Sequence, residues 1–160
     1  MANFLKDYSG KKILVTGHTG FKGAWLSRIL VLAGADVYGL ALEAETNSLF
    51  DVAGDLGLKE STILDIRDRN AVENYFTIHR FDGIFHLAAQ PLVRRSYKEP
   101  IETFDTNVMG TAHILNAAVS NKATHWIVAI TTDKVYRNVE KLGGYLEDEP
   151  LGGKDPYRAW

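Results

Sequence analysis

Three glycines at three-residue spacing, Gly17, Gly20 and Gly23, constrain the fold of this chain more than any other feature. They follow an apolar run at 13–15 and precede an amphipathic stretch at 24–33. A strand, a glycine-rich turn and a helix in this order favour a turn that binds a nucleotide pyrophosphate, although an ordinary glycine turn that binds nothing is the alternative. Gly17 permits the sharp turn, Gly20 lets backbone N–H groups approach the anion, and Gly23 lets the helix pack closely. The helix N-terminus adds a partial positive charge.

Apolar strand-like runs alternate with helical stretches along the rest of the chain. We expect strands at 12–16, 36–42, 61–64, 81–87 and 125–131. Helices are expected at 24–33, after the N-cap Asp68, and from about 100 to 120. Repeated strand–helix units predict a parallel sheet with right-handed crossovers, which is a doubly wound α/β fold of Rossmann type.

The residues with chemical potential follow the predicted strands. In a doubly wound fold a ligand lies beyond the carboxyl ends of the strands. The sequence places four groups there: 17–23, Asp65 with Ile66, 88–90, and 131–134. These groups are therefore predicted to share one edge of the sheet and to form a site.

Two of the predicted helices have apolar residues at helical spacing. In the first helix the apolar face is expected to carry Leu26, Ile29, Leu30 and Ala33, with Ser27 and Arg28 opposite. In the long helix the apolar positions are Ile101, Phe104, Val108, Ala112, Leu115 and Val119. Between the fourth strand and the long helix, Arg94 and Arg95 are expected on a mobile loop, and binding of substrate phosphates is the alternative.

Composition excludes several classes of function. The chain has 160 residues, enough for one domain with a substantial core, and its net charge of −2 provides no basic surface for nucleic acid. The absence of cysteine excludes disulfides and thiol catalysis and fits a reducing cytoplasm. No apolar stretch resembles a signal peptide or a membrane span, so a cytoplasmic protein with no membrane partner is expected. The histidines lack metal-ligand spacing, so no metal is expected.

Several motifs resemble the CDP-glucose 4,6-dehydratases, which are extended short-chain dehydrogenase/reductases of the NAD-dependent sugar epimerase/dehydratase family. The motifs lie at 17–23, 65–68, 86–97, 107–111, 131–134 and 152–157. The resemblance implies NAD as cofactor and CDP-glucose as substrate of the full-length enzyme. The implied reaction oxidises the glucose C4 hydroxyl, eliminates water across C5–C6 and returns the hydride to C6. The product is CDP-4-keto-6-deoxyglucose, a precursor of deoxysugars.

The resemblance also implies roles for four catalytic residues. Tyr157 would remove the proton of the C4 hydroxyl, and Thr132 would hydrogen-bond that hydroxyl. Asp133 would protonate the departing C6 oxygen, and Lys134 stands where related dehydratases have a carboxylate base. A tyrosine with a pKa near 10 needs a nearby cation to act as a base. An ordinary polar strand end is the alternative for 131–134.

The implied cofactor site is larger and comes from several segments. Its residues are Gly17, His18, Thr19, Gly20, Phe21, Lys22, Gly23, Asp65, Ile66, Leu87, Ala88, Ala89, Gln90, Asn107 and Thr131. Asp65 and Ile66 are expected beside the adenine, and Asn107 is expected to face inward from the long helix. At the second strand Ala41 replaces the ribose-binding aspartate of many relatives, but no arginine is present there for a 2′-phosphate. NAD is therefore favoured over NADP.

The chain departs from the family pattern at its end. The lysine of the family motif Tyr-x-x-x-Lys would fall one residue beyond Trp160. We therefore expect 1–160 to be the NAD-binding N-terminal portion of a Rossmann-type domain, without the later strands and the C-terminal substrate domain, and inactive by itself. A nucleotide-binding or regulatory Rossmann module without catalysis is the alternative. In relatives the long helix joins a four-helix bundle across a two-fold axis, so exposed apolar surface and a homo-oligomer are expected.

Overall fold

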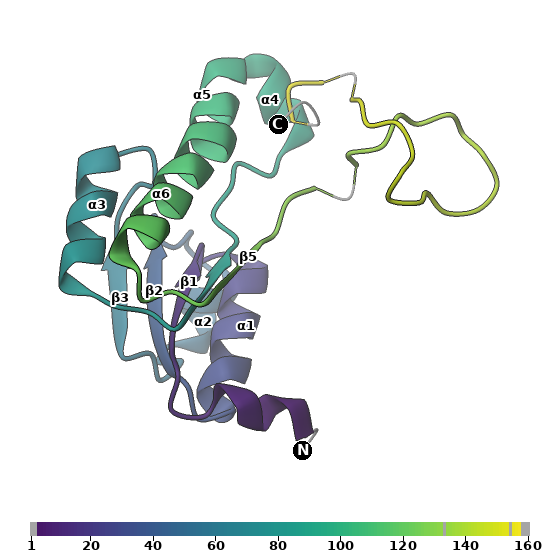
Figure 1. Ribbon diagram of the computed structural model, residues 1–160. Coiled ribbons are helices and arrows are strands. Elements are labelled where there is room, and N and C mark those ends of the chain that lie inside the picture. Colours follow the sequence, from purple (N-terminus) through teal and green to yellow (C-terminus); the bar gives the residue numbers. More distant parts are fainter. Residues whose placement is uncertain (1–2, 133, 154, 158–160) are drawn as a thin grey trace.

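The computed structural model describes residues 3–132, 134–153 and 155–157. Within them a parallel sheet is formed by β1 (Lys12–Thr16), β2 (Asp36–Ala41), β3 (Glu60–Ile63), β4 (Gly83–His86) and β5 (Trp126–Ala129). The strand order is β3-β2-β1-β4-β5, and helices cover both faces (Figure 1). The predicted doubly wound parallel α/β fold is confirmed.

The helices lie in two groups. One face of the sheet carries α1 (Phe21–Leu32) and the short α2 (Leu49–Ala53); the other carries α3 (Arg69–Ile78) and α6 (Thr111–Asn121) (Figure 1). The chain reaches α6 through α4 (Val93–Lys98), α5 (Pro100–Phe104) and the π-helical turn η2 (Asp105–Gly110), and it begins with the 3₁₀ turn η1 (Asn3–Tyr8). None of the helices in the described part of the chain has the length and apolar character that a bilayer span requires.

The central strand β1 separates two hydrophobic cores. Leu14 packs in the core beneath α3 and α6, whereas Ile13 and Val15 pack in the core beneath α1. All three side chains are fully buried, because successive residues of a strand point to opposite faces of a covered sheet. Each such burial stabilises the fold by roughly 1.5–3 kcal/mol. The continuous apolar run in the sequence is explained by this two-sided burial.

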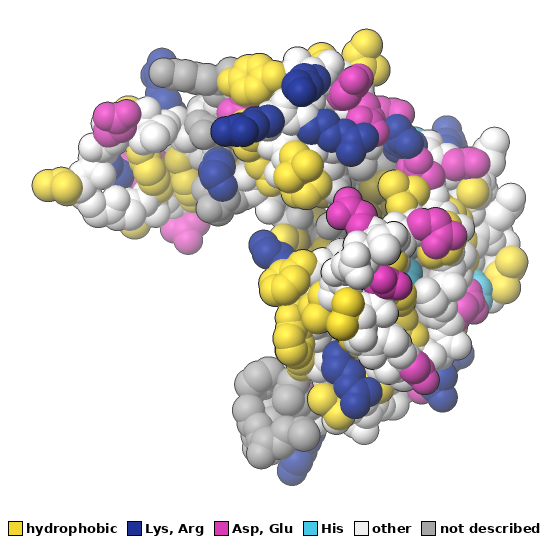
Figure 2. Space-filling model, turned by 180° about the vertical axis from the view of Figure 1, so that it is seen from behind, with side chains coloured by type: hydrophobic (Ala, Val, Ile, Leu, Met, Phe, Trp, Pro, Cys, Tyr) yellow, Lys and Arg dark blue, Asp and Glu magenta, His cyan; other side chains and the backbone are white. Residues whose placement is uncertain are grey.

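The face of α1 that meets the sheet differs from the predicted one. Ser27 is fully buried, together with Gly23, Ala24 and Leu30, whereas Ile29 is 43% exposed. Small residues at these positions let the helix lie close to the sheet, so backbone proximity rather than apolar content decides which face is buried. Exposed apolar side chains consequently gather along the flank that α1 occupies (Figure 2), and they include Phe21, Trp25, Ile29 and Leu32.

The predicted long helix is continuous but is built from α5, η2 and α6. Its buried side carries small or polar residues together with one large apolar residue: Thr103, Asn107, Gly110, Ile114, Ala117 and Ala118. The apolar positions noted in the sequence face outward, with Ile101 83% and Val119 74% exposed. The expected exposed apolar surface is therefore confirmed. Arg94 and Arg95, which were expected on a loop, lie instead in helix α4.

A buried chain of hydrogen bonds joins β1, β4 and α6. The Thr16 hydroxyl accepts from the backbone N–H groups of Leu87 and Ala88, each at 3.1 Å, so its own hydrogen is directed to His86 Nδ1 at 2.7 Å. His86 Nε2 then donates to the Thr111 hydroxyl at 2.9 Å, which defines the tautomer of the ring. Burial lowers the pKa of His86 to about 4, so the ring is neutral.

His18 is the second buried histidine and lies under β2 and β3. Its Nε2 is 2.7 Å from the Ser61 hydroxyl, and its ring makes an edge contact with Phe50 at 5.2 Å between centroids. Nδ1 is buried without a hydrogen-bond partner in the described chain. Burial lowers the pKa of His18 to about 4. This ring is also neutral in the folded protein.

We predict that acid destabilises the fold through these two rings. Above pH 6.5 His18 and His86 are neutral in both states and contribute no pH dependence. Between pH 6.5 and about 4 the unfolded chain binds protons that the folded chain excludes, so stability falls as pH falls. The shifts correspond to about 3 kcal/mol for each ring. The free energy of unfolding, measured by urea titration across this range, checks the prediction.

The exposed His125 supplies the control for this pH dependence. Each ring accounts for about half of the predicted fall in the unfolding free energy. His86→Gln and His18→Asn, where folded, should therefore each remove about half of this pH dependence. His125→Gln should leave the profile as in the wild type. An unfolding free energy that stays constant from pH 7 to pH 4.5 in the wild type would contradict the prediction.

Candidate functional site

The glycine turn between β1 and α1 is closed by backbone on two sides. Gly17 has φ +72°, and a Cβ there would lie 2.9 Å from the Ala88 nitrogen. A Cβ on Gly23 would lie 2.0 Å from the Gly17 carbonyl oxygen. The space at Gly20 is open by comparison, since its nearest neighbour would be the Gly17 oxygen at 3.3 Å. The turn therefore excludes side chains at Gly17 and Gly23 for packing reasons and leaves Gly20 facing outward.

The N-terminus of α1 begins at this open position. Gly20 is the N-cap residue, and no side chain caps the helix. The first N–H groups of a helix have no partner within the helix, and they carry a partial positive charge. Phe21 and Lys22 are exposed at this end. Thr19 is buried and donates its hydroxyl to the Leu42 carbonyl at 3.0 Å, which fastens the turn to the end of β2. The arrangement suits a bound anion.

The loop after β4 is held at both of its ends, by the last residue of β1 and by η2. At one end Thr16 receives the N–H groups of Leu87 and Ala88. At the other end the Asn107 side chain accepts from the Gln90 N–H at 2.8 Å and donates to the Gln90 carbonyl at 3.1 Å. Asn107 is 1% exposed, as expected for an inward-facing residue. The backbone between these anchors is therefore fixed beside Gly17.

The side chain of Gln90 forms its hydrogen bonds within the protein. Its amide donates to the Thr103 hydroxyl at 2.9 Å and to the Leu92 carbonyl at 3.3 Å, and its oxygen accepts from the Leu92 N–H at 2.7 Å. His18 is likewise turned inward. Any contact of these two predicted cofactor residues with a ligand would therefore involve their backbone in this conformation.

Asp65 and Ile66 follow β3 and lie at the same edge of the sheet. Ile66 is buried, and a Cβ on Gly110 would lie 2.6 Å from the Ile66 Cδ1 atom, so glycine at 110 makes room for this side chain. The Ile66 carbonyl accepts from His113 Nδ1 at 3.0 Å. Asp65 remains partly exposed, and its hydrogen bonds with Arg67 lower the pKa of its carboxyl group, so it is a carboxylate.

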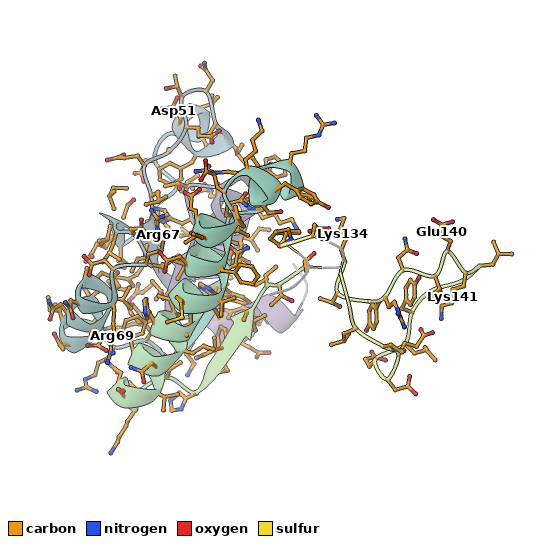
Figure 3. The ribbon with its side chains drawn as sticks, turned by 90° about the horizontal axis from the view of Figure 1, so that it is seen from above. Asp51, Arg67, Arg69, Lys134, Glu140 and Lys141 are labelled. Atoms are coloured by element: carbon orange, nitrogen blue, oxygen red, sulfur yellow. The ribbon has the colours of Figure 1, made fainter. Side chains whose placement is uncertain are left out.

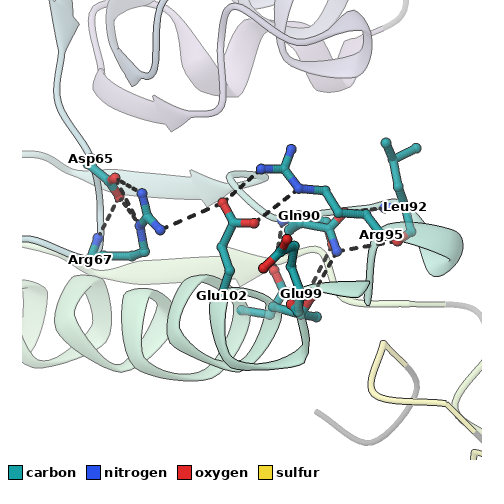
Figure 4. Close-up of polar contacts among 9 residues, drawn as sticks. Asp65, Arg67, Gln90, Leu92, Arg95, Glu99 and Glu102 are labelled. Atoms are coloured by element: carbon teal, nitrogen blue, oxygen red, sulfur yellow. Dashed lines mark hydrogen bonds and ion pairs between the residues drawn. The ribbon is translucent and has the colours of Figure 1, made fainter. Parts of the chain in front are cut away.

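An ion-pair network that the sequence did not predict extends from Asp65 (Figure 4). The Arg67 guanidinium contacts both oxygens of Asp65, with Nη2 to Oδ2 at 2.5 Å, and Arg67 Nη1 lies 3.7 Å from the Glu102 carboxylate. Glu102 in turn accepts from Nε and Nη2 of Arg95 at 3.0 and 2.8 Å. We call Asp65, Arg67, Glu102 and Arg95 the charged relay. Only the Asp65–Arg67 pair has a local sequence signal, because Arg67 N–H also closes a turn on Asp65.

The predicted catalytic residues lie beyond β5. Thr131 is exposed, Thr132 is 6% exposed, and the Thr132 hydroxyl accepts from the Lys134 N–H at 3.1 Å. Asp133 lies outside the described residues. The chain then leaves the sheet as a projecting arm, residues 135–152, before it reaches Tyr157 (Figures 1 and 3). Hydrogen bonds join the two limbs of the arm, from Arg137 N–H to the Pro150 carbonyl and from Gly152 N–H to the Val135 carbonyl, each at 2.8 Å.

The structure thus brings the predicted groups to one edge of the sheet. The glycine turn, the Asp65 turn, the loop after β4 and Thr131 all follow carboxyl ends of neighbouring parallel strands. This is the edge at which doubly wound folds bind ligands. No cluster of histidine, aspartate and glutamate suitable for a metal ion occurs among the described residues.

Comparison with known proteins gives a consistent family. A family model for GDP-mannose 4,6 dehydratase matches residues 14–159. The chain is 50% identical over 151 residues to the CDP-glucose 4,6-dehydratase of Salmonella typhimurium, covering 94% of this chain and 42% of that protein. It resembles the solved UDP-glucose 4-epimerase of Thermus thermophilus in complex with NAD, with a TM-score of 0.79, 28% identity, and coverage of 92% of this chain and 46% of that one.

A second solved structure, the UDP-glucose 4-epimerase of Thermotoga maritima with UDP-glucose, matches with a TM-score of 0.81 and 26% identity, covering 92% of this chain and 47% of that one. The chain spans less than half the length of these relatives. The resemblance to the CDP-glucose 4,6-dehydratases noted in the sequence is confirmed. Because the family model covers nearly the whole chain, the chain belongs to the GDP-mannose 4,6-dehydratase family.

Proposed function

We propose that this chain is the cofactor-binding part of an NAD-dependent CDP-glucose 4,6-dehydratase, which converts CDP-glucose to CDP-4-keto-6-deoxyglucose. One observation carries the proposal: the turn at Gly17–Gly23 is packed shut at its outer glycines and open at Gly20, directly at an uncapped helix N-terminus. The choice of CDP-glucose is supported by the identity of 50% to the Salmonella enzyme.

The residues at the sheet edge fit a dinucleotide. The uncapped N–H groups of α1 would hold the pyrophosphate, and the open position at Gly20 leaves it room. The Asp65 carboxylate would accept from the adenine amine, with Ile66 behind the ring, and the fixed loop at Ala88 and Ala89 would border the ribose. NAD, when bound, supplies the hydride acceptor of the reaction. The stretch after β2 carries no arginine to receive a 2′-phosphate.

The polar residues after β5 would serve the sugar. Tyr157 would take the C4 hydroxyl proton, Thr132 would orient that hydroxyl, and Asp133 would protonate the departing C6 oxygen. Lys134 would take the C5 proton. The burial of Thr132 supports a fixed hydroxyl for orienting a substrate. In the full-length enzyme these groups would face CDP-glucose.

We predict that Gly20→Val abolishes NAD binding while the protein still folds. The Gly20 backbone, with φ −77° and ψ 165°, suits valine, and its Cβ would meet only one atom at 3.3 Å. The branched side chain would occupy the pyrophosphate position and separate it from the helix N–H groups. Loss of about two charge-assisted hydrogen bonds lowers affinity by roughly 100-fold or more. Isothermal titration calorimetry with NAD checks this result.

Two further glycines serve as controls for this variant. Gly144 in the projecting arm has no atom near its Cβ position, so Gly144→Val should leave NAD affinity unchanged. Gly23→Ala should unfold or strongly destabilise the protein, because its Cβ would lie 2.0 Å from a carbonyl oxygen. Equal NAD affinity of Gly20→Val and the wild type would show that the pyrophosphate does not bind at this turn.

We further predict that the 160-residue chain by itself yields no 4-keto product from CDP-glucose. It spans 42% of the Salmonella enzyme, so most of the surface that would orient a sugar lies in parts with no counterpart here. Orientation alone can contribute roughly 7–11 kcal/mol to lowering a barrier. An absorbance assay for the product with added NAD checks this, and turnover above a no-protein blank would contradict it.

We propose that the second partner of this chain is another copy of itself. The exposed face of α5, η2 and α6 carries an apolar stripe at helical spacing: Ile101, Phe104, Val108, Leu115 and Val119. Exposed fractions in this stripe range from 37% at Leu115 to 83% at Ile101. A stripe of this kind on one helical segment suits pairing with the same stripe across a two-fold axis.

We predict that charge on this stripe abolishes self-association. The double variant Val108→Glu with Val119→Glu should be monomeric, because each carboxylate would have to be buried in the dimer. Val52→Glu on α2, at a position that is 73% exposed, is the matched control and should associate like the wild type. Light scattering over a range of concentrations measures both. A wild-type chain that remains monomeric at the highest concentration would contradict the proposal.

A further inference from the structure

The charged relay joins the turn after β3 to the two consecutive helices α4 and α5. Asp65 and Arg67 lie in the turn after β3, Glu102 lies on α5, and Arg95 lies on α4. The charges alternate along it, so each inner residue has an opposite charge on both sides (Figure 4). The residues are partly exposed, with Arg67 and Glu102 at 34% and 27% of their side-chain area. Single exposed pairs contribute little to stability, so the relay is more informative about orientation than about folding.

The Asp65 carboxylate is bound by Arg67 and is still reachable from solvent. Three N–H groups of Arg67 bind the carboxylate: the backbone N–H at 2.9 Å, Nε shared between both oxygens at 3.1 and 2.9 Å, and Nη2 at 2.5 Å. An ionised carboxylate offers about four acceptor positions. Two contacts on each oxygen already match this number, but the Asp65 side chain is 31% exposed, so a further donor can still approach the carboxylate from solvent. A ligand amine would be attracted to this carboxylate, whereas a ligand carbonyl would be repelled by it.

The position of Arg67 depends in turn on Glu102. Arginine side chains have considerable rotamer freedom, and the Asp65 contacts fix only one side of the guanidinium. The other side, at Nη1, faces Glu102. Glu102 is itself held by the two parallel contacts from Arg95, which is the specific bidentate geometry of an arginine–carboxylate pair. The hydrogen bonds with Asp65, together with the negative charges of Asp65, Glu102 and Asp105, raise the pKa of Arg67, so its cationic form is secured.

We propose that Arg67 and Glu102 are positioning residues for adenine recognition: Arg67 fixes the orientation of the partly exposed Asp65 carboxylate toward the adenine amine, and Glu102, fixed by Arg95, holds Arg67 in place. This inference rests on the proposed NAD site. It assigns a role to helix α4, which ties the adenine end of the cofactor site to the segment that follows β4. Neither residue needs to touch the dinucleotide.

Two dinucleotides test this inference directly. NAD carries an amine on its purine, and nicotinamide hypoxanthine dinucleotide carries a carbonyl at the same position. The wild type should prefer NAD by about 10- to 100-fold, the effect of one hydrogen bond to a charged group. Glu102→Gln keeps the size of the side chain, removes its charge and should lower this preference by about threefold. Calorimetric dissociation constants of both ligands give the ratio.

The ratio separates positioning from general structural damage, because damage to the fold weakens both ligands equally. Arg67→Lys keeps the charge but loses the planar, multiply donating guanidinium group, so it should also lower the preference. Arg95→Gln should lower the preference as Glu102→Gln does. Glu73→Gln is the matched control: it removes a carboxylate from the exposed pair with Arg69, at 2.7 Å on α3, and should leave the ratio unchanged.

Each outcome decides a different claim. A wild-type chain that binds neither dinucleotide would overturn both the proposed cofactor site and this inference. A wild type that binds both equally would leave the cofactor site standing and overturn the role of Asp65, Arg67 and Glu102. A wild-type preference that survives unchanged in Glu102→Gln and Arg67→Lys would overturn the positioning role alone. A preference reduced in these variants and in Arg95→Gln, but retained in Glu73→Gln, would support it.

Discussion

The hydroxyl group of Thr16 holds together the parts of the molecule on which the site depends. It stands at the end of the central strand, accepts two backbone N–H groups from the loop after β4, and donates to a neutral histidine that is bound to α6. A hydroxyl can do all of this at once because it is both donor and acceptor. The loop is therefore placed beside the glycine turn before any ligand arrives, and preorganisation of this kind lowers the cost of binding.

The same region depends on positions that lack a side chain. Gly17 and Gly23 admit backbone where a Cβ would clash, and Gly110 admits the Ile66 side chain. Close packing transmits such constraints, since interiors contain few voids. The buried side of α1 and of the segment from α5 to α6 is accordingly poor in large apolar residues, while larger ones lie outside. The site edge is thus made by close backbone approach and hydrogen bonds, and hydrophobic area dominates deeper in the sheet.

Local sequence patterns predicted most of the fold. The apolar run of β1, the Asp68 cap of α3 and the glycine turn each depend on residues adjacent in sequence, and all were predicted. The prediction of the buried face of α1 was wrong, because helical periodicity reports only where the apolar residues lie. This helix instead buries the small residue Ser27, which lets it approach the sheet closely. The pairing of Arg67 with Glu102 has no local signal, because it joins segments that are distant in the sequence. Helix α4 was missed because it has only six residues and no side-chain cap at its N-terminus. The roles of Thr132, Lys134 and Tyr157 remain predictions that only chemistry can test.

The contact between His18 and Gly39 has a consequence for evolution. A Cβ on Gly39 would lie 2.5 Å from the His18 ring, so the ring occupies the volume that a side chain on the neighbouring strand would need. The two positions therefore share one volume between them. A lineage that replaces the histidine by a small residue gains space for a side chain on β2, and one that places a side chain there first must lose the ring. Across an alignment of relatives these two columns should covary, with large and small residues exchanging places.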